Sequence, residues 1–296
     1  MPVRDDLGKR MKEFYEQVPK TRLVRRMPVA IRIDGKAFHS FTKNFNRPFD
    51  DILIKSMQET TKYLCENIQG CVLGYTQSDE ITLILVDYKN LESSAWFDYE
   101  VQKMCSISAS MATMAFNKFF IQNAHDWAND FHEFKYTDEE IEKRFSVYTK
   151  AIEKGAMFDA RCFNIPKEEV TNLIYWRQLD ATRNSIQMVG QANFSHNELH
   201  GKSCNMIQDM LHEQKGINWN DFPTCQKRGS CVIKHNETTT YVTHDADGNV
   251  TTGSSQRPHW VIDTEIPIFR GEDREYIDKL IRVNSCPCKG EINIAY

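Results

Sequence analysis

Two short acidic motifs constrain this chain of 296 residues more than any other feature: I-R-I-D-G-K-A at 31–37 and Q-S-D-E at 77–80. The first places Asp34 at the end of an apolar strand, and the second places Asp79 in a hairpin turn. The two aspartates are 45 residues apart, which leaves room for one strand, one helix and one return strand. Carboxylates at the ends of neighbouring strands form a site for hard divalent cations such as Mg2+. Nucleotidyl transfer needs such cations to activate the attacking hydroxyl and to neutralise the phosphates.

Each motif on its own has an ordinary explanation. Asp-Gly is a common turn, and Ser-Asp-Glu is also typical of a loop in solvent. Together, at this spacing and within a basic segment, they favour a functional site. Glu80 is either a third acid of that site or a residue that faces solvent.

A basic segment accompanies the first motif. Between Lys20 and Arg47 there are eight basic residues and a single acid, Asp34. We expect this segment to surround the metal site with positive charge; the alternative is a solvated basic face. The net charge of −4 argues against a protein that is held on nucleic acid by its overall charge alone.

Hydrophobic periodicity gives the order of elements in the first half. We expect a helix over 5–17, a strand over 28–34, a helix from the cap at Asp50 to about 68, a hairpin over 72–87 and a long helix over 97–123. This order predicts an α+β fold, with a palm-like (ferredoxin-like) antiparallel sheet that carries helices on one face. The open face would then hold Asp34 and Asp79.

The second half follows a charged stretch at 137–144. It should contain a strand over 156–163, helices over 167–192 and from 203 to about 213, and β-hairpins over 229–264 with a turn at Asp247-Gly248-Asn249. We therefore divide the chain into a palm-like catalytic half, 1–135, with the metal and nucleotide site, and a C-terminal half, 136–296, that completes the sheet.

Two motifs resemble known sites and fail on inspection. Gly201-Lys202-Ser203 resembles the end of a phosphate-binding loop, but the required first glycine is replaced by His196 and no strand precedes it. Rejection of the loop leaves open whether Lys202 binds phosphate. His196 and His200 are four residues apart, but the glutamate between them is not in the zinc-protease position, so metal binding there is disfavoured.

Two further polar groups have open interpretations. Asp159 and Arg161 share a face of the 156–163 strand and are either a structural ion pair or part of the site. Arg177, Asp180 and Asn184 share one helix face, which is either solvated or a substrate contact beside Trp176.

The remaining features bear on the class of protein. No apolar run approaches the roughly 18 residues of a membrane span, and the N-terminus lacks a signal-peptide core. We therefore expect a cytoplasmic protein that does not associate with a membrane. The nine cysteines are an odd number at irregular spacings, which predicts free, mostly packed thiols.

Four motifs together resemble one enzyme family. I-R-I-D-G-K-A-F-H, Y-T-Q-S-D-E, F-D-A-R and W-R-Q-x-D, in this order, are similar to those of the tRNA-histidine guanylyltransferases and their 3′-5′ polymerase-like relatives, closest to the bacterial and archaeal branch. The resemblance implies a palm-like catalytic domain and addition of nucleotides to the 5′ end of tRNA. ATP or GTP would activate the 5′ phosphate, and the 3′-hydroxyl of an incoming GTP would attack it. Family members are commonly tetrameric, so we expect a homotetramer whose C-terminal half contacts tRNA.

The same resemblance implies roles for individual residues. Asp34 and Asp79 would be the catalytic ligands of two Mg2+ ions, together with the carbonyl of Gly35. The expected contacts to the nucleoside triphosphate are Asp34, Gly35, Lys36, Ala37, Phe38, His39, Ser78, Asp79, Arg32 and Lys43. Among them, Arg32, Lys36 and Lys43 are the expected contacts to the phosphates.

One departure affects the expected specificity. Eukaryotic members follow W-R-Q-x-D with a histidine and a run of asparagines, whereas this chain has Thr182 at the histidine position and keeps Asn184. The change favours templated addition, including repair of truncated tRNA, over obligate addition of G. The alternatives are a palm-fold cyclase that makes a cyclic (di)nucleotide without RNA, and a non-catalytic RNA-binding module. The sequence of the hairpin region, roughly 235–264, does not match the eukaryotic pattern, so the resemblance assigns it no role.

Overall fold

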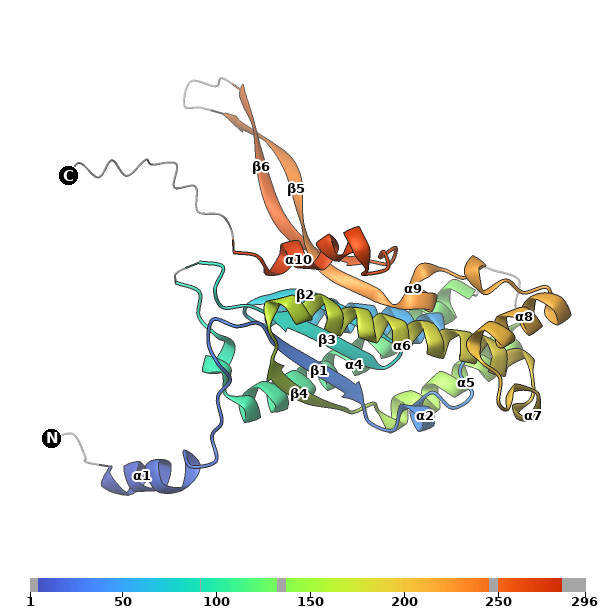
Figure 1. Cartoon of the computed structure of the whole chain (residues 1–296), viewed down its shortest axis with the longest axis horizontal. Helices are drawn as coiled ribbons and strands as arrows, with labels where there is room; N and C mark the ends of the chain where they lie inside the picture. Colours follow the sequence, from blue (N-terminus) through green and yellow to red (C-terminus); the bar gives the residue numbers. More distant parts are fainter. Residues whose placement is uncertain (1–4, 91, 132–136, 245–249, 284–296) are drawn as a thin grey trace.

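A single antiparallel sheet organises the protein. The computed structural model describes residues 5–90, 92–131, 137–244 and 250–283, and its six named strands lie in the order β4-β1-β3-β2-β5-β6 (Figure 1). Their bounds are β1 (Val29–Gly35), β2 (Cys71–Gln77), β3 (Glu80–Leu85), β4 (Phe158–Asn164), β5 (Ser230–His244) and β6 (Val250–Asp263). Strands from both halves of the chain therefore share one sheet, and β1 lies between β3 and β4.

Helices flank this sheet and extend beyond it. The longer ones are α3 (Asp51–Asn67), α4 (Val101–Phe131), α5 (Asp138–Lys154), α6 (Lys167–Asn193) and α8 (Cys204–Lys215). The shorter ones are α1 (Asp6–Met11), α2 (Phe38–Phe41), α7 (His196–Leu199), α9 (Thr224–Arg228) and α10 (Glu275–Ile281), with η1 (Lys12–Glu16), η2 (Trp96–Tyr99), η3 (Trp219–Asp221) and η4 (Gly271–Arg274). None of the described helices is long and apolar enough to span a membrane.

The main core lies between the sheet and helices α3 and α4. Val29, Ile31 and Ile33 alternate along β1 and are fully buried in this core, as the period-two pattern predicts. Helix α3 begins where predicted because the Asp50 carboxylate accepts a 3.0 Å hydrogen bond from the Leu53 N–H.

The opposite face of the sheet is also covered, which corrects the expectation of helices on one face only. Helix α6 crosses this face in front of β2 and β3, and α10 packs beside it (Figure 1). Val170 and Ile174 of α6 and Ile277 of α10 are fully buried in a second core against the sheet, which includes Ala30 and Ile84. The predicted open face therefore exists only towards one end of the strands.

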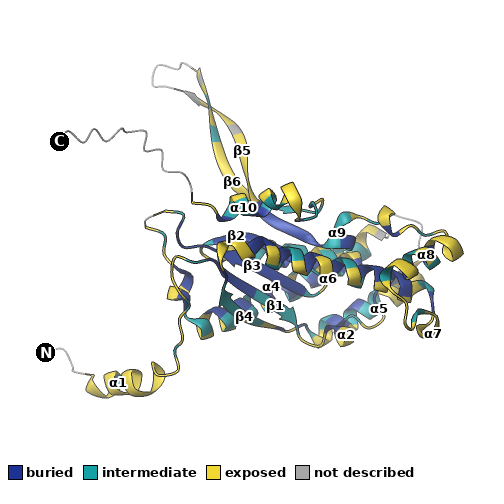
Figure 2. Ribbon diagram, viewed as in Figure 1, coloured by how far each residue is buried: buried dark blue, intermediate teal, exposed yellow. Residues whose placement is uncertain are grey.

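Strands β5 and β6 form one long hairpin rather than several. Their register runs from Cys231 opposite Asp263 to His244 opposite Val250. The base of the hairpin is buried in the sheet, whereas the distal part projects from the body and is exposed (Figures 1 and 2). The predicted Asp247-Gly248-Asn249 turn lies outside the described residues.

Two further segments differ from the prediction in detail. The charged stretch at 137–144 is the start of α5, where Thr137 and Glu140 cap the helix reciprocally. The predicted helix at 5–17 is present as α1 and η1, but its apolar residues Leu7 and Phe14 are 67% and 66% exposed. The seven cysteines in the described part of the chain are free thiols, as expected.

Candidate functional site

Strand register brings the two predicted aspartates to the same end of the sheet. Residue Asp34 on β1 is paired with Glu80 on β3, and Asp79 precedes Glu80 in the two-residue turn from β2. The N–H of Gly35 donates a 3.1 Å hydrogen bond to the carbonyl oxygen of Asp79. The end of β1 is therefore tied directly to the turn that carries the second carboxylate.

A cavity of about 700 Å3 opens at this end of the sheet. Its wall contains eight of the ten predicted nucleotide contacts, namely Asp34, Gly35, Ala37, Phe38, His39, Lys43, Ser78 and Asp79. Its size is in the range of pockets that hold small molecules and cofactors. Lys36 and Arg32 do not line it.

The electrostatics of the cavity are unbalanced towards negative charge. Burial raises the pKa of Asp79, and the like charges of Asp34 and Glu80 add to that effect, whereas the Ser78 hydroxyl, which donates a 3.0 Å hydrogen bond, opposes it. Within the described residues, neither Asp34 nor Asp79 forms an ion pair with Lys, Arg or His. Two neighbouring carboxylates without such a partner are a donor set suited to a cation.

The strand end is shaped by residues that approach one another closely. A Cβ on Gly35 would lie 2.2 Å from Cδ2 of Phe38, so only glycine fits against this ring. Ala37 and Ser78 adopt left-handed conformations with φ of 55° and 50°. Non-glycine residues in this region each carry a cost of about 1 kcal/mol, and such residues concentrate at functional sites.

The residues at this strand end could supply part of the coordination shell of Mg2+. Asp34 and Asp79 supply hard carboxylate oxygens, and the Gly35 carbonyl is a third oxygen at the same strand end. No group of three or more His, Cys, Asp or Glu residues in the described chain is arranged to hold a metal. Mg2+ commonly binds one or two protein carboxylates and completes its coordination shell with water and substrate phosphates. Two aspartates are therefore enough carboxylate ligands for a Mg2+ site.

Glu80 and Arg32 belong to a separate network behind the cavity. The Glu80 carboxylate accepts from Arg32 and Arg177, each at 2.5 Å, and Arg177 also contacts Asp180 at 2.8 Å. Trp176 lies against both guanidinium groups, at 5.4 Å from Arg32 and 4.4 Å from Arg177. Glu80 is 8% exposed, so it does not face solvent, and the polar face of α6 at Arg177 and Asp180 is an ion-pair network.

The basic segment does not surround the aspartates as expected. Arg25 contacts Asp87 at 2.7 Å and Arg22 contacts Asp98 at 2.8 Å. These pairs involve the chain before β1 and the residues after β3, at the other end of the strands. Of the basic residues in the segment, Lys43 and Arg47 line the cavity.

Sequence reasoning missed the contribution of α6 and of the loop after α2. Met188 and Gln191 of α6 line the cavity, as do Asn46 and Arg47 of the loop. Arg47 was counted among the basic residues, which was a usable signal. Nothing local marks Gln191, because its position depends on how α6 crosses the sheet.

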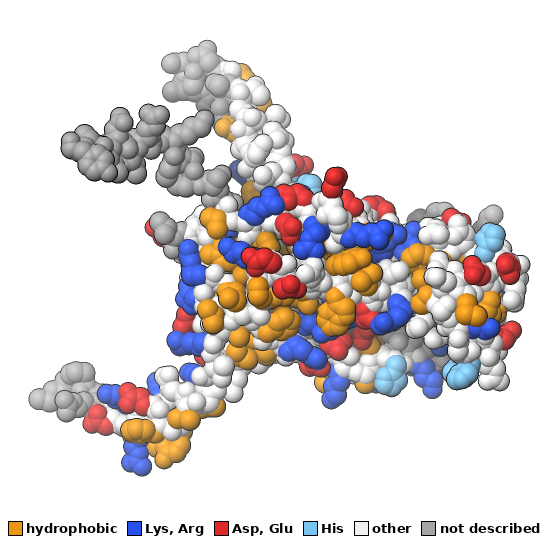
Figure 3. All heavy atoms as spheres, in the orientation of Figure 1, with side chains coloured by type: hydrophobic (Ala, Val, Ile, Leu, Met, Phe, Trp, Pro, Cys, Tyr) orange, Lys and Arg blue, Asp and Glu red, His pale blue; other side chains and the backbone are white. Residues whose placement is uncertain are grey.

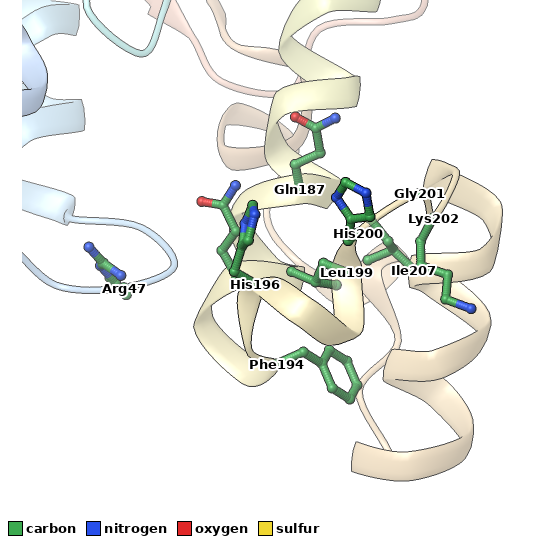
Figure 4. A pocket seen from close by; sticks show the side chains of 10 residues that line it. Arg47, Gln187, Phe194, His196, Leu199, His200, Gly201, Lys202 and Ile207 are labelled. Atoms are coloured by element: carbon green, nitrogen blue, oxygen red, sulfur yellow. The ribbon is translucent and has the colours of Figure 1, made fainter.

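The remaining predicted groups do not line the cavity, although Asp159 pairs with Asp34 across β1 and β4 and the charge of Asp34 acts on Arg161. Asp159 and Arg161 form a 2.8 Å pair on β4 that is more than half exposed. Thr182 donates a 3.0 Å hydrogen bond to the carbonyl of Gln178, one turn earlier in α6, and does not line the cavity. His196, His200 and Lys202 line a second cavity (Figure 4).

The fold and the site define an α+β protein with an acidic cavity at one end of an antiparallel sheet, and comparison with known proteins agrees. The family model described as tRNAHis guanylyltransferase (Thg1) matches residues 8–166. Curated relatives include the tRNA(His) guanylyltransferase of Saccharomyces cerevisiae, 27% identical over 224 residues, with 71% of this chain and 83% of the relative covered. An uncharacterised protein of Acanthamoeba polyphaga mimivirus is 28% identical over 244 residues, with 78% of each covered.

Solved structures are similar over a greater part of the chain. A bacterial tRNA(His) guanylyltransferase-like protein in complex with ATP has a TM-score of 0.72 and 37% identity, covering 94% of this chain and all of that one. The corresponding GTP complex has a TM-score of 0.67 and 36% identity, covering 93% and 99%. The chain therefore belongs to the tRNAHis guanylyltransferase family, and it is an enzyme of the nucleotidyltransferase class.

Proposed function

We propose that this enzyme adds nucleotides to the 5′ end of tRNA in the 3′-5′ direction, with Mg2+ held by Asp34, Asp79 and the carbonyl of Gly35. The observation that carries the proposal is the cavity at the end of β1. Both carboxylates, Lys43 and His39 line it, and among the described residues no basic side chain forms an ion pair with either carboxylate. The resemblance of the chain to proteins solved with ATP and GTP supports a nucleoside triphosphate as the occupant.

The reaction has two balanced steps. In the first, an oxygen of the tRNA 5′-monophosphate attacks the α-phosphorus of ATP or GTP, and pyrophosphate leaves. In the second, the 3′-hydroxyl of an incoming nucleotide attacks the activated 5′ phosphate and loses its proton, and the nucleoside monophosphate leaves. Bound Mg2+ would lower the pKa of the attacking hydroxyl and neutralise charge on the phosphates.

The protein's own groups position these reactants. Lys43, which lines the same cavity as the aspartates, supplies a cation to the phosphates. Ser78 orients the Asp79 carboxylate through its 3.0 Å hydrogen bond. The buried ring of Phe38, packed between Gly35 and the aromatic core, fixes the loop that carries Ala37 and His39. Arg32 acts indirectly, because it holds Glu80 behind the turn rather than lining the cavity.

Templated addition is the finer part of the proposal. Thr182 is turned into its own helix by a hydrogen bond to Gln178 and contributes nothing to either cavity wall near the aspartates. A site without a residue that selects G at this position would rely on pairing with the opposite strand. We extend the proposal to a palm-like catalytic half at 1–135, to tRNA contacts by 136–296, and to a cytoplasmic homotetramer, on the strength of the family resemblance.

The test is addition to a 5′-monophosphorylated tRNA that lacks its first nucleotide, with ATP, Mg2+ and each nucleoside triphosphate in turn. Incorporation of only the complementary nucleotide supports templated addition, and the Asp79→Ala variant should be inactive. Incorporation of G against every template base would support obligate guanylyl transfer instead. A cyclic product from GTP or ATP alone, with no RNA extended, would show a cyclase and overturn the proposal.

A further inference from the structure

A second cavity, of about 630 Å3, lies beside the first and is built by a different part of the chain. Helix α7 and the turn that follows it form one wall, and the end of α6 forms another (Figure 4). Gly201 adopts a φ of +72° after α7, which suits glycine, and no atom lies within 4 Å of the position of a Cβ there. The turn therefore presents open main chain to the cavity.

The side chains of this wall are donors of hydrogen bonds and positive charge. Arg47, Lys202, His196 and His200 line the cavity, as does Gln187 of α6; Figure 4 shows Arg47 on a separate loop, across from α7. An imidazole offers an N–H donor in its neutral and its protonated form. The two histidine rings are 6.1 Å apart between centroids, which places them side by side on α7 and its cap.

No acid opposes these donors. The described lining residues include neither Asp nor Glu. The nearest glutamate in sequence, Glu198, is turned away because it accepts hydrogen bonds of 2.8 and 2.6 Å from the N–H and hydroxyl of Ser195. The cavity is thus positive, whereas its neighbour is lined by three aspartates, Asp34, Asp50 and Asp79.

The two cavities are adjacent at defined residues. Arg47 and Gln191 line both of them. A phosphate-bearing molecule at Asp34 and Asp79 therefore has Arg47 between it and the second cavity. Successive phosphates occur in an RNA strand and in the tail of a nucleoside triphosphate.

We propose that the cavity lined by Arg47, His196, His200 and Lys202 binds phosphate groups next to the reacting centre. The chemistry required is that of a phosphodiester or polyphosphate: Arg binds it as a fork, Lys as a point charge and the imidazoles as N–H donors. The identity of the phosphate-bearing molecule rests on the proposed function, whereas the phosphate site itself does not.

The experiment measures binding rather than turnover. Lys202→Ala and His200→Ala are compared with the wild type, with Lys202→Arg as a charge-conserving variant. Lys154→Ala is the matched control, because Lys154 is exposed on α5 and lines neither cavity. Each protein is titrated separately with 5′-monophosphorylated tRNA and with GTP at several salt concentrations, and thermal midpoints verify folding.

Loss of a phosphate contact should weaken tRNA binding several-fold and reduce the slope of log affinity against log salt by about 1. If only tRNA affinity falls, the cavity holds the RNA backbone; if only GTP affinity falls, it holds a triphosphate tail. Lys202→Arg should retain most of the affinity. Unchanged affinity for both ligands in Lys202→Ala and His200→Ala would overturn the inference.

This outcome is separable from that of the proposed function. If the wild type transfers no nucleotide but Lys202→Ala weakens phosphate binding, the phosphate site is supported and the proposed function is overturned. A protein that extends tRNA normally, with unchanged affinities in every variant, would retain the function and lose the site.

Discussion

The main-chain N–H of Gly35 donates a 3.1 Å hydrogen bond to the carbonyl oxygen of Asp79. This bond joins the end of one strand to the turn between two others, so it fixes the main chain of Asp34 relative to that of Asp79. The backbone positions of the acidic pair do not depend on the carboxylates, so changes to either carboxylate should affect chemistry without disturbing the fold.

Asp34→Asn and Asp79→Asn should each reduce the rate of nucleotide addition by at least about 100-fold, because a lost metal ligand removes several kcal/mol of stabilisation from the transition state. The thermal midpoint should stay the same or rise, since each change removes repulsion between like charges. Rates are measured under single-turnover conditions, with Ser40→Ala on the exposed side of α2 as control. A comparable rate in either asparagine variant would place the metal elsewhere.

Gly35→Ala should destabilise the protein by about 1–3 kcal/mol, because the added methyl group would lie 2.2 Å from a Phe38 ring carbon and the ring must move. Urea unfolding measures the change. Combining the substitution with Phe38→Leu should recover part of the loss relative to Phe38→Leu alone, since a smaller side chain leaves room for the methyl. Strictly additive losses would mean that the contact with Phe38 is not the cause.

Arg177→Met should destabilise the protein by about 3–5 kcal/mol, because it removes one partner of the buried Glu80 carboxylate. Arg161→Met is the matched control: its partner Asp159 is exposed, and the loss there should be below about 1 kcal/mol. Denaturant unfolding of Arg177→Met, Glu80→Gln and the double variant gives the coupling energy. A coupling near zero would contradict the described network.

Cys162 should react slowly with iodoacetamide in the folded protein. Burial raises the pKa of its thiol to about 12, and the neighbouring thiol of Cys105, 3.6 Å away, adds to the effect. The thiolate is the nucleophile, so alkylation should increase as pH rises towards that value and should be fast at pH 8 only after unfolding. Mass spectrometry of the labelled peptide follows this. Rapid native labelling at pH 8 would show that the thiol is accessible and ionised.

Elements with a local signal were predicted well. The alternation in β1 and the cap at Asp50 placed the strand and α3 closely, and the Ser78-Asp79 turn follows from short-range pattern. The coverage of the second face was not predictable in the same way. Helix α10 was not expected at all, and the contact of α6 with the sheet depends on pairing across more than a hundred residues.

The candidate site shows the same division between local and distant information. Asp34, Asp79 and the 34–39 loop apart from Lys36 line the same cavity because two neighbouring motifs meet in one register. Arg32 was predicted to contact phosphate because of its charge, yet its guanidinium forms an ion pair with Glu80 on the neighbouring strand β3. Charge alone does not say which partner a guanidinium meets. That depends on the packing of α6 over the strand.

The position of β1 between β3 and β4 also matters while the chain is being made. β3 ends at residue 85 and β4 begins at residue 158, so β1 lacks its second neighbour during synthesis of the intervening 72 residues. An unpaired strand edge invites association with other chains. A ribosome that carries this chain therefore exposes the strand of Asp34 for several seconds, at roughly 5–20 residues per second. Pauses in that interval should increase aggregation of nascent chains more than pauses after residue 164.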